Sequence, residues 1–259
     1  MNAPPLRWPP LQTPPEPLAP EAGEVLLVCA PLDLPEGLIA RLRETLDPIE
    51  RARADRFVTA QLRSRFVAGR GLLRWLLGWA TGAAPAALRF RYGEHGKPAL
   101  EPQAGTGGLG FNVSHSQGLA LYALSRGVVL GVDLEAVQGR QSDGVADRFF
   151  HPDESAWLRK LPDGPRTEAF YAIWCAKEAF IKATGLGLSQ GLDSFSFACG
   201  PEGPVRLGWL RGDPRGPERF ELHRLDPAAG FRAALITEGR GLRTRCFSWA
   251  PGVATAAAD

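Results

Sequence analysis

The sequence predicts an α+β protein made of two similar halves, each with helices followed by several strands. Three observations support this fold class. A β-prone segment over 24–30 precedes helix-forming stretches over 35–80, short β-prone runs then continue to residue 135, and the same order of helices and strands returns over 143–249. No close sequence repeat accompanies this pattern, so the duplication rests on the order of the elements. The halves are predicted to join near residue 137.

The first half is predicted to span 24–136, after a proline-rich arm over 1–23. The arm holds eight prolines, which exclude a helix or an interior strand. Pro35 suits the first position of a helix. Beyond it, "RFVAGRGLLRWLLGWA" mixes apolar residues with arginines in an amphipathic pattern interrupted by glycines. The predicted elements are a strand over 24–30, helices over 35–46 and 48–80, and strands over 88–92, 110–114, 119–125 and 128–135.

The second half is predicted to span 137–250, with a tail over 251–259. Its clearest element is "FYAIWCAKEAFIKATG", 170–185, where apolar residues recur at spacings of three, four and seven and Gly185 suits a helix C-terminus. One face of this helix should therefore be buried. The predicted elements are helical segments over 143–184 and strands over 195–199, 205–210, 219–225, 231–237 and 243–249.

Composition excludes several classes of function. The 259 residues are 44% hydrophobic and 22% charged with a net charge of +2, which is typical of a soluble globular protein and too mild for a nucleic-acid binder. No apolar run approaches the roughly 20 residues of a membrane span, and no signal peptide is visible. The four cysteines form no CxxC pair, which argues against zinc and against a disulfide framework. We expect a cytoplasmic protein.

Two acids close a strand-like run, and their spacing raises a question about charge. In "VVLGVDLE", Asp133 and Glu135 are two residues apart, so on a strand both carboxylates leave the same face. Like charges that close repel unless a cation lies between them. A third acid, Glu178, lies on the flank of the buried stripe of the 170–185 helix, where an acid needs a partner. Taken singly, these acids also fit a strand end in solvent and a surface ion pair with Lys182.

Basic and hydroxyl side chains add a second group. "NVSHS" places Ser114 and His115 at a strand end, without the GxSxG pattern of an acyl-transferring serine. "HGKPAL" is a turn that projects Lys97, and arginines recur over 50–57 and 63–74. Each feature alone fits a structural histidine, an ordinary loop or a soluble helix surface. Beside three carboxylates, they indicate a site where cations hold phosphates and the acids hold a hard metal that bridges phosphate oxygens.

The ordered set of motifs resembles the surfactin-synthetase type of 4'-phosphopantetheinyl transferase. The motifs are "HGKPAL", "FNVSHS", "GVDLE", "RFFHPDE" and "WCAKEAFIKATGLGL", with "DPIERARADRF" upstream, in the family's order and spacing over 47–198. The resemblance implies transfer of phosphopantetheine from coenzyme A to a serine of an apo acyl or peptidyl carrier protein, using Mg²⁺ or Mn²⁺. It also implies two similar α+β halves in a pseudo-two-fold arrangement, with the active site in the cleft between them.

The resemblance assigns roles residue by residue. Asp133, Glu135 and Glu178 match the three metal-binding acids, and Lys182 matches the lysine that meets the pyrophosphate. Glu178, directly or through a bound water, is the expected base for the carrier serine. Asp133, Glu178 and Lys182 are thus the expected catalytic residues. The expected coenzyme A contacts are Arg53, Arg65, Gly96, Lys97, Pro98, Ser114, His115, Asp133, Lys177, Glu178 and Lys182, among which Arg53, Ser114 and His115 match positions at the 3'-phosphate or nearby.

Three positions depart from the family pattern or lack a role. Glu50 stands where some relatives have a basic residue at the 3'-phosphate, and Glu154 matches an acid without an assigned role. Cys175 occupies a place more often taken by Thr or Ser, and we expect it to pack rather than to act as a nucleophile.

Two other functions remain compatible with these residues. One is a metal-dependent phosphoester hydrolase that uses the same acids on coenzyme A-like substrates, with water as the nucleophile. The other is a non-catalytic protein that binds coenzyme A or a carrier domain. The presence of all three acids with Lys182 favours the transferase, because a binding protein has no physical reason to keep a costly acid cluster. Two half-sites in one chain make a monomer sufficient. The sequence does not decide between carriers of fatty-acid, polyketide and peptide synthesis.

Overall fold

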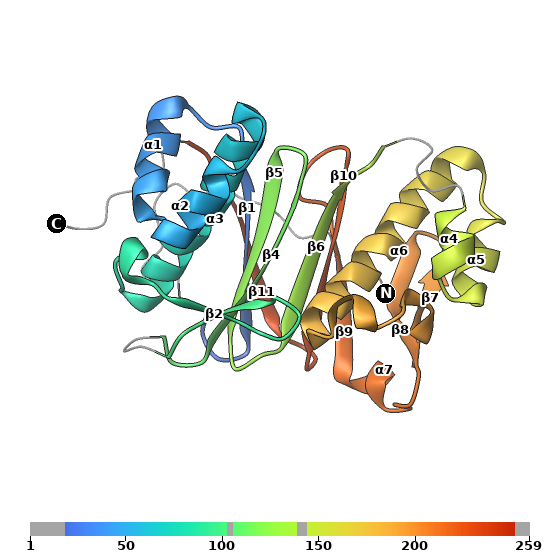
Figure 1. Ribbon diagram of the computed structural model, residues 1–259. Coiled ribbons are helices and arrows are strands. Elements are labelled where there is room, and N and C mark those ends of the chain that lie inside the picture. Colours follow the sequence, from blue (N-terminus) through green and yellow to red (C-terminus); the bar gives the residue numbers. More distant parts are fainter. Residues whose placement is uncertain (1–18, 103–105, 139–143, 252–259) are drawn as a thin grey trace.

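Two β-sheets lie against each other between two groups of helices in the computed structural model, which describes residues 19–102, 106–138 and 144–251 (Figure 1). Helices α1–α3 lie along one flank and α6 along the other, with the sheets between them. One sheet has the strand order β11-β1-β5-β4 and the other β6-β10-β9. The predicted α+β class and the two lobes are confirmed.

The first half contains the predicted elements with two refinements. The helical region 48–80 is divided into two helices, because Thr59 accepts a hydrogen bond from the Leu62 amide and starts a new helix. A short hairpin forms around "HGKPAL" as a separate two-stranded sheet. The elements are β1 (Glu24–Pro31), α1 (Glu36–Thr45), α2 (Pro48–Asp55), α3 (Ala60–Thr81), the 3₁₀ turn η1 (Pro85–Ala87), β2 (Phe90–Tyr92), β3 (Pro98–Leu100), β4 (Leu109–Ser116) and β5 (Leu119–Arg126).

The second half has the same order of elements, with a hairpin of its own, β7–β8. The elements are β6 (Leu130–Ala136), α4 (Val145–Phe149), α5 (Pro152–Leu158), α6 (Asp163–Thr184), η2 (Gly187–Ser189), η3 (Leu192–Ser194), β7 (Phe195–Gly200), β8 (Gly203–Leu210), α7 (Gly216–Arg219), β9 (Phe220–Leu225), β10 (Phe231–Glu238) and β11 (Arg243–Ser248).

Strand pairing differs from the predicted division of the chain near residue 137. β6, predicted as the last strand of the first half, is antiparallel to β10 in the second sheet. β11, predicted in the second half, runs parallel to β1 in the first sheet. Because β1 is buried along nearly its whole length, a free edge there would leave backbone groups without partners, and β11 supplies them.

The duplication predicted from element order is visible in the pairing. β1 and β6 open their halves, and each lies antiparallel to the second strand of a later antiparallel pair, β5 of β4–β5 or β10 of β9–β10. β4 and β9 then lie beyond β5 and β10. Helices α3 and α6 both have 22 residues, and each ends at a glycine with positive φ, Gly82 or Gly185.

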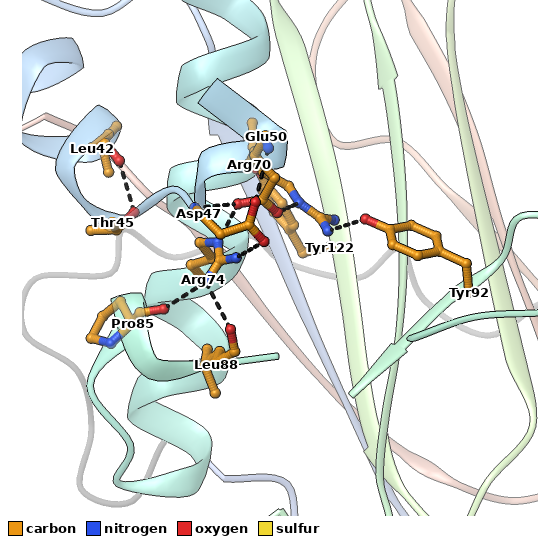
Figure 2. Close-up of polar contacts among 11 residues, drawn as sticks. Leu42, Thr45, Asp47, Glu50, Arg70, Arg74, Pro85, Leu88, Tyr92 and Tyr122 are labelled. Atoms are coloured by element: carbon orange, nitrogen blue, oxygen red, sulfur yellow. Dashed lines mark hydrogen bonds and ion pairs between the residues drawn. The ribbon is translucent and has the colours of Figure 1, made fainter. Parts of the chain in front are cut away.

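A buried ion pair under a capped short helix is repeated in both halves. In the first half, Glu50 closes the capping box of α2 with Asp47, and its carboxylate accepts hydrogen bonds from Arg70 and Arg74 (Figure 2). Arg74 is fully buried and also donates to the carbonyl of Pro85. Glu50 therefore belongs to the interior of the first half, where it holds α2 on α3, which explains why an acid stands there.

The second half builds the same pair with a lysine. Glu154 closes the capping box of α5 with His151, and its Oε2 lies 2.7 Å from Nζ of Lys177. Lys177 is the fifteenth residue of α6, as Arg74 is of α3. Both side chains of the Glu154–Lys177 pair are almost wholly buried, so breaking the pair would leave a buried charge without a partner. Glu154 thereby gains a structural role.

Alternation along β6 decides where the acids point. Val132 and Leu134 pack into the core between the two sheets. Asp133 and Glu135 have the opposite parity, so they leave the other face, which α6 covers. α6 comes so close to Gly131 that a Cβ there would lie 2.1 Å from the Ala179 carbonyl oxygen. The glycine of "GVDLE" thus allows the helix to reach the acids.

Candidate active site

The site forms where β4 of the first half meets β6 of the second. These neighbouring strands are joined by side chains. The Asn112 Oδ1 accepts the Val132 amide at 2.8 Å, and the Ser116 Oγ accepts the Ala136 amide at 3.1 Å. Because Ser114 lies between Asn112 and Ser116 with the same parity, it also points toward β6.

Five polar side chains from three elements meet at this junction. The Lys182 Nζ donates to Asp133 Oδ1 at 2.6 Å and to Ser114 Oγ at 2.9 Å. Ser114 Oγ in turn donates to Asp133 Oδ1 at 2.8 Å, and Ser116 Oγ donates to Glu135 Oε2 at 2.8 Å. Asp133 is buried, whereas Lys182 is partly exposed. The group therefore has a buried carboxylate at its base and a lysine that reaches it from solvent.

The three acids influence one another electrostatically, as the sequence suggested. Burial raises the pKa of Glu178, and the negative charges of Asp133 and Glu135 raise it further, against the opposing effect of Lys182. Burial also raises the pKa of Glu135, where the Ser116 hydrogen bond opposes the shift and Asp133 adds to it. The acids thus repel one another, and Lys182 offsets only part of that repulsion.

The donor set suits a hard cation, although the described residues form no closed ligand cluster. No group of three or more His, Cys, Asp or Glu side chains within 19–102, 106–138 and 144–251 is arranged to hold a metal ion. Yet Oδ2 of Asp133 is buried without a hydrogen-bond partner among the described residues. Carboxylate oxygens are the ligands that Mg²⁺ and Mn²⁺ prefer. An orphan oxygen beside two repelling carboxylates fits an added cation.

His115 and Arg53 extend the same electrostatic neighbourhood on the first half. Partial burial lowers the pKa of His115, and the nearby cations Lys182 and Arg53 lower it further while Asp133 opposes them. Both side chains are exposed, and the Arg53 guanidinium lies 5.3 Å from the centre of the Phe66 ring. A surface with two cations around an uncharged imidazole favours an anion.

The side chain of Arg65 reaches from α3 to Gly118, in the turn between β4 and β5 just beyond Ser116. It makes two hydrogen bonds of 2.7 Å to Asp33, and a Cβ on Gly118 would lie 2.5 Å from that carboxylate. The guanidinium lowers the pKa of Asp33 through this contact. Arg65 therefore lies at the same end of the first sheet as Ser116, but its guanidinium is already paired with Asp33.

Of the three predicted residues in the β2–β3 hairpin, Gly96 and Pro98 shape the backbone, whereas Lys97 makes side-chain hydrogen bonds. Gly96 has φ +77°, which makes the turn, and Pro98 begins β3. Lys97 directs its ammonium group inward to backbone carbonyl oxygens. A cavity of about 540 Å³ lies beside it, between the hairpin, the starts of β4 and β6 and the end of α6, and contains none of the three acids.

Two of the predicted residues have interior positions. Lys177 was expected to contact coenzyme A, but it is fully buried and directs its ammonium group to Glu154 and to the carbonyls of Leu192 and Phe195. All three donors of the ammonium are used, so the expectation for Lys177 is corrected to a structural ion pair. Cys175 is buried and donates to the Arg232 carbonyl at 3.2 Å, in agreement with a packing role.

Sequence reasoning missed Asn112 and Gly131. Both support the site without carrying charge: Asn112 joins the strands of the two halves, and Gly131 admits α6. The polar residues at every second position of "NVSHS", which are Asn112, Ser114 and Ser116, contained a signal, because a buried strand with polar groups on one face must bond them to a neighbour. No helix in the described part of the chain is long and apolar enough to cross a membrane.

Comparisons with known proteins match both halves. A family model described as the 4'-phosphopantetheinyl transferase superfamily matches residues 129–236, and one described as 4'-phosphopantetheinyl transferase, N-terminal, matches residues 38–126. The chain is 42% identical to the 4'-phosphopantetheinyl transferase HetI of Nostoc sp. over 71% of this chain and 78% of HetI. It is 29% identical to the 4'-phosphopantetheinyl transferase Sfp of Bacillus subtilis, over 75% and 83% respectively. The Thermotoga maritima holo-[acyl-carrier-protein] synthase structure overlaps 46% of this chain and 65% of its own, with 22% identity and a TM-score of 0.33.

Proposed function

Because this chain belongs to the 4'-phosphopantetheinyl transferase superfamily, we propose that it transfers phosphopantetheine from coenzyme A to a serine of an apo acyl or peptidyl carrier protein. One observation supports this most directly. Lys182 of α6 bonds to Asp133 of β6 and Ser114 of β4, so both halves contribute to one charged group. The group lies within a single chain, so we propose a monomer as the active unit. A cytoplasmic location is part of the same proposal.

Coenzyme A is a polyanion, and the exposed cations around the junction suit its phosphates. We assign Arg53 and His115 to the 3'-phosphate and Lys182 to the pyrophosphate. Ser114 supplies a hydroxyl beside Lys182, and the hairpin turn with Gly96 and Pro98 offers backbone to the adenosine part. Arg65 also lies near this surface, but its ion pair with Asp33 offsets its charge.

Asp133, Glu135 and Glu178 are the residues that would hold a divalent cation. Mg²⁺ or Mn²⁺ held there would neutralise negative charge on the pyrophosphate of the substrate. Burial and the repulsion among the acids raise the pKa values of Glu135 and Glu178, which supports a cation at this place. The buried, unpartnered Oδ2 of Asp133 supports the assignment.

The chemical step follows from these positions. The hydroxyl oxygen of the carrier serine attacks the phosphorus that bears the pantetheine, and the bond from that phosphorus to 3',5'-adenosine diphosphate breaks. Glu178, the proposed base, accepts the serine proton, directly or through a water molecule. Lys182 stabilises the negative charge on the departing diphosphate.

The proposal is tested by the mass of a carrier protein. We expect several apo-carriers, incubated with the chain, coenzyme A and Mg²⁺, to include at least one that gains a single phosphopantetheine. EDTA should stop the reaction, and added Mg²⁺ or Mn²⁺ should restore it. Turnover that is unaffected by EDTA would disprove the metal assignment. No modification across fatty-acid, polyketide and peptide carriers would disprove the transferase.

The same assay addresses the other two functions. A phosphoester hydrolase would release phosphopantetheine from coenzyme A without any carrier, because water would replace the serine. A binding protein would take up coenzyme A and leave it unchanged. The names of the relatives favour transfer, since HetI and Sfp are both named as 4'-phosphopantetheinyl transferases.

The assignment of the 3'-phosphate gives a second prediction. His115→Ala and Arg53→Ala should each weaken the binding of coenzyme A more than that of 3'-dephospho-coenzyme A. A charge-assisted hydrogen bond contributes about 1.5–3 kcal/mol, so the preference for coenzyme A should fall about tenfold or more. Calorimetry with both ligands measures the difference, and equal losses for both ligands would place these residues elsewhere.

The pH dependence of that preference follows from His115. Its pKa in the free protein lies below the ordinary value of about 6.5, so the imidazole is neutral at pH 7. A bound phosphate favours the imidazolium and raises that pKa. The preference for coenzyme A should therefore increase as the pH falls from 8 to 6, with uptake of a proton on binding, and His115→Ala should abolish this trend.

A further inference from the structure

The hairpin of the first half reaches across to the end of the long helix of the second. Its turn is closed by hydrogen bonds from Gly96 N to Gly93 O at 2.9 Å and from Gly93 N to Lys97 O at 3.0 Å. His95 in this turn packs against Gly187 of η2, so closely that a Cβ on Gly187 would lie 3.1 Å from the His95 Cβ. The turn therefore lies on the segment that follows α6.

The ammonium group of Lys97 lies in the same contact and is fully occupied. Its Nζ donates to the carbonyls of Lys182 at 2.5 Å, Ala183 at 3.2 Å and Leu130 at 3.2 Å. An ammonium group has three hydrogens to donate, and the three carbonyls account for all of them. Lys97 thus has no donor left for a phosphate, in contrast to the role expected from the sequence.

The acceptors explain why a cation lies there. Lys182 and Ala183 are in the last turn of α6, where carbonyl groups have no partner within the helix and the helix dipole is negative. Leu130 is the first residue of β6. Lys97 therefore connects three segments: the hairpin of the first half, the C-terminal turn of α6, and the start of the strand that carries Asp133.

Lys182 is held at both ends as a result. Its carbonyl oxygen accepts the Lys97 ammonium, and its own ammonium reaches Asp133 and Ser114. The Lys182 side chain is flexible between Cα and Nζ. The position of its ammonium group therefore depends on a fixed backbone. We propose that Lys97 is a positioning residue for Lys182, which sets the last turn of α6 against β6 and so directs the Lys182 ammonium to the phosphates. This role rests on the proposed transferase function.

A double-mutant cycle tests the coupling. Lys97→Met should lower kcat for carrier modification about tenfold or more, with a smaller change in the KM for coenzyme A, because the side chain acts on the reacting group through Lys182. In a Lys182→Met background the same substitution should cost at most about twofold, since residues in one network are not additive. Equal factors in both backgrounds, or a raised KM with kcat unchanged, would overturn the proposal.

Lys177→Met serves as the matched control. Lys177 of α6 also has a fully used ammonium group, but its partners are Glu154, Leu192 and Phe195, on the side of α6 away from Lys97. Its loss should lower the melting temperature, and its effect on turnover per folded molecule should be the same with and without Lys182. If Lys97→Met is recovered unfolded, Lys97→Gln, which keeps a neutral donor, replaces it in the same cycle.

Hydrogen exchange separates this inference from the proposed function. In Lys97→Met the Gly185 amide, which donates to Ile181 at the end of α6, should exchange faster than in the wild-type chain, whereas in Lys177→Met it should not change selectively. This readout does not require transfer activity. A wild-type chain that modifies no carrier would refute the function alone. Unchanged exchange at Gly185 in Lys97→Met would refute the positioning role.

Discussion

Asp133→Asn is expected to lower the rate of carrier modification by about a hundredfold or more, while the melting temperature changes by only a few degrees. The amide keeps the shape of the carboxylate and can still accept the Ser114 hydroxyl, but it removes the charge that meets Lys182 and the proposed cation. Stability changes little because two effects oppose each other. The pair with Lys182 is lost, and the repulsion that raises the pKa of Glu178 and Glu135 is relieved.

Ligand-induced stabilisation gives the second measurement. Coenzyme A with Mg²⁺ should raise the melting temperature of the wild-type chain, because ligands bind the folded state, and the rise should shrink in Asp133→Asn. Asp147→Asn is the matched control: Asp147 is also paired with a cation, Arg159, but both side chains are exposed and lie on the α4–α5 segment. If Asp133→Asn unfolds many degrees early and keeps its turnover per folded molecule, the carboxylate is structural.

Gly131→Ala is expected to destabilise the fold and to lower transfer as well. The new Cβ would lie 2.1 Å from the carbonyl oxygen of Ala179 and 2.4 Å from the amide nitrogen of Ala183, so α6 must move away from β6. Overpacking of this kind costs about 1–3 kcal/mol, which corresponds to a fall in melting temperature of roughly 2–12 °C for a chain of this size. Because α6 carries Glu178 and Lys182, the same shift moves both away from Asp133.

Gly164→Ala is the control for this substitution. Gly164 lies in the first turn of the same helix, and a Cβ there meets nothing within 4 Å. Alanine favours a helix over glycine by up to about 1 kcal/mol, whereas Pro165 disfavours the helical backbone for a preceding residue that has a Cβ. Because these effects oppose each other, the melting temperature should change less than in Gly131→Ala. Gly131→Ala with wild-type melting temperature and wild-type turnover would show that α6 does not need this close approach.

The positions of the three acids could be predicted because each follows from periodicity within a single strand or helix. Strand periodicity places Asp133 and Glu135 on one face wherever the strand lies, and the structure shows that face under α6. Helix periodicity places Glu178 and Lys182 one turn apart on one side of α6. The order of helices and strands likewise contained the duplication, which the pairing of β1 with β5 and of β6 with β10 confirms.

The sequence did not predict which lysine of α6 is buried, because burial depends on what packs against each face of the helix. Lys177 and Lys182 are five residues apart on α6, which separates them by about 140° around the helix axis. One therefore faces the interior and Glu154, and the other faces Asp133. Both lie among small and apolar residues of one helix. The packing of α5 and β7 on one side of α6, and of β6 on another, distinguishes the structural lysine from the site lysine.

The duplication also explains why one acid cluster exists rather than two. Trp75 is the sixteenth residue of α3, as Glu178 is of α6. Val28 faces the fourth residue of β5, as Asp133 faces the fourth residue of β10. Trp75 and Val28 are both buried in the core under α1–α3. The positions that carry acids in the second half are thus filled with apolar side chains in the first.

The sequence by itself determined the α+β class, the repeated order of elements and the acids that share a face, since each depends on periodicity within one segment. The tertiary structure decided which half each strand joins, which lysine is buried and how the halves meet through Asn112, Ser114 and Ser116. It also turned Lys97 from a predicted ligand into a link between the halves. These outcomes depend on partners distant in the chain, and a local pattern shows which groups need partners but not which residues supply them.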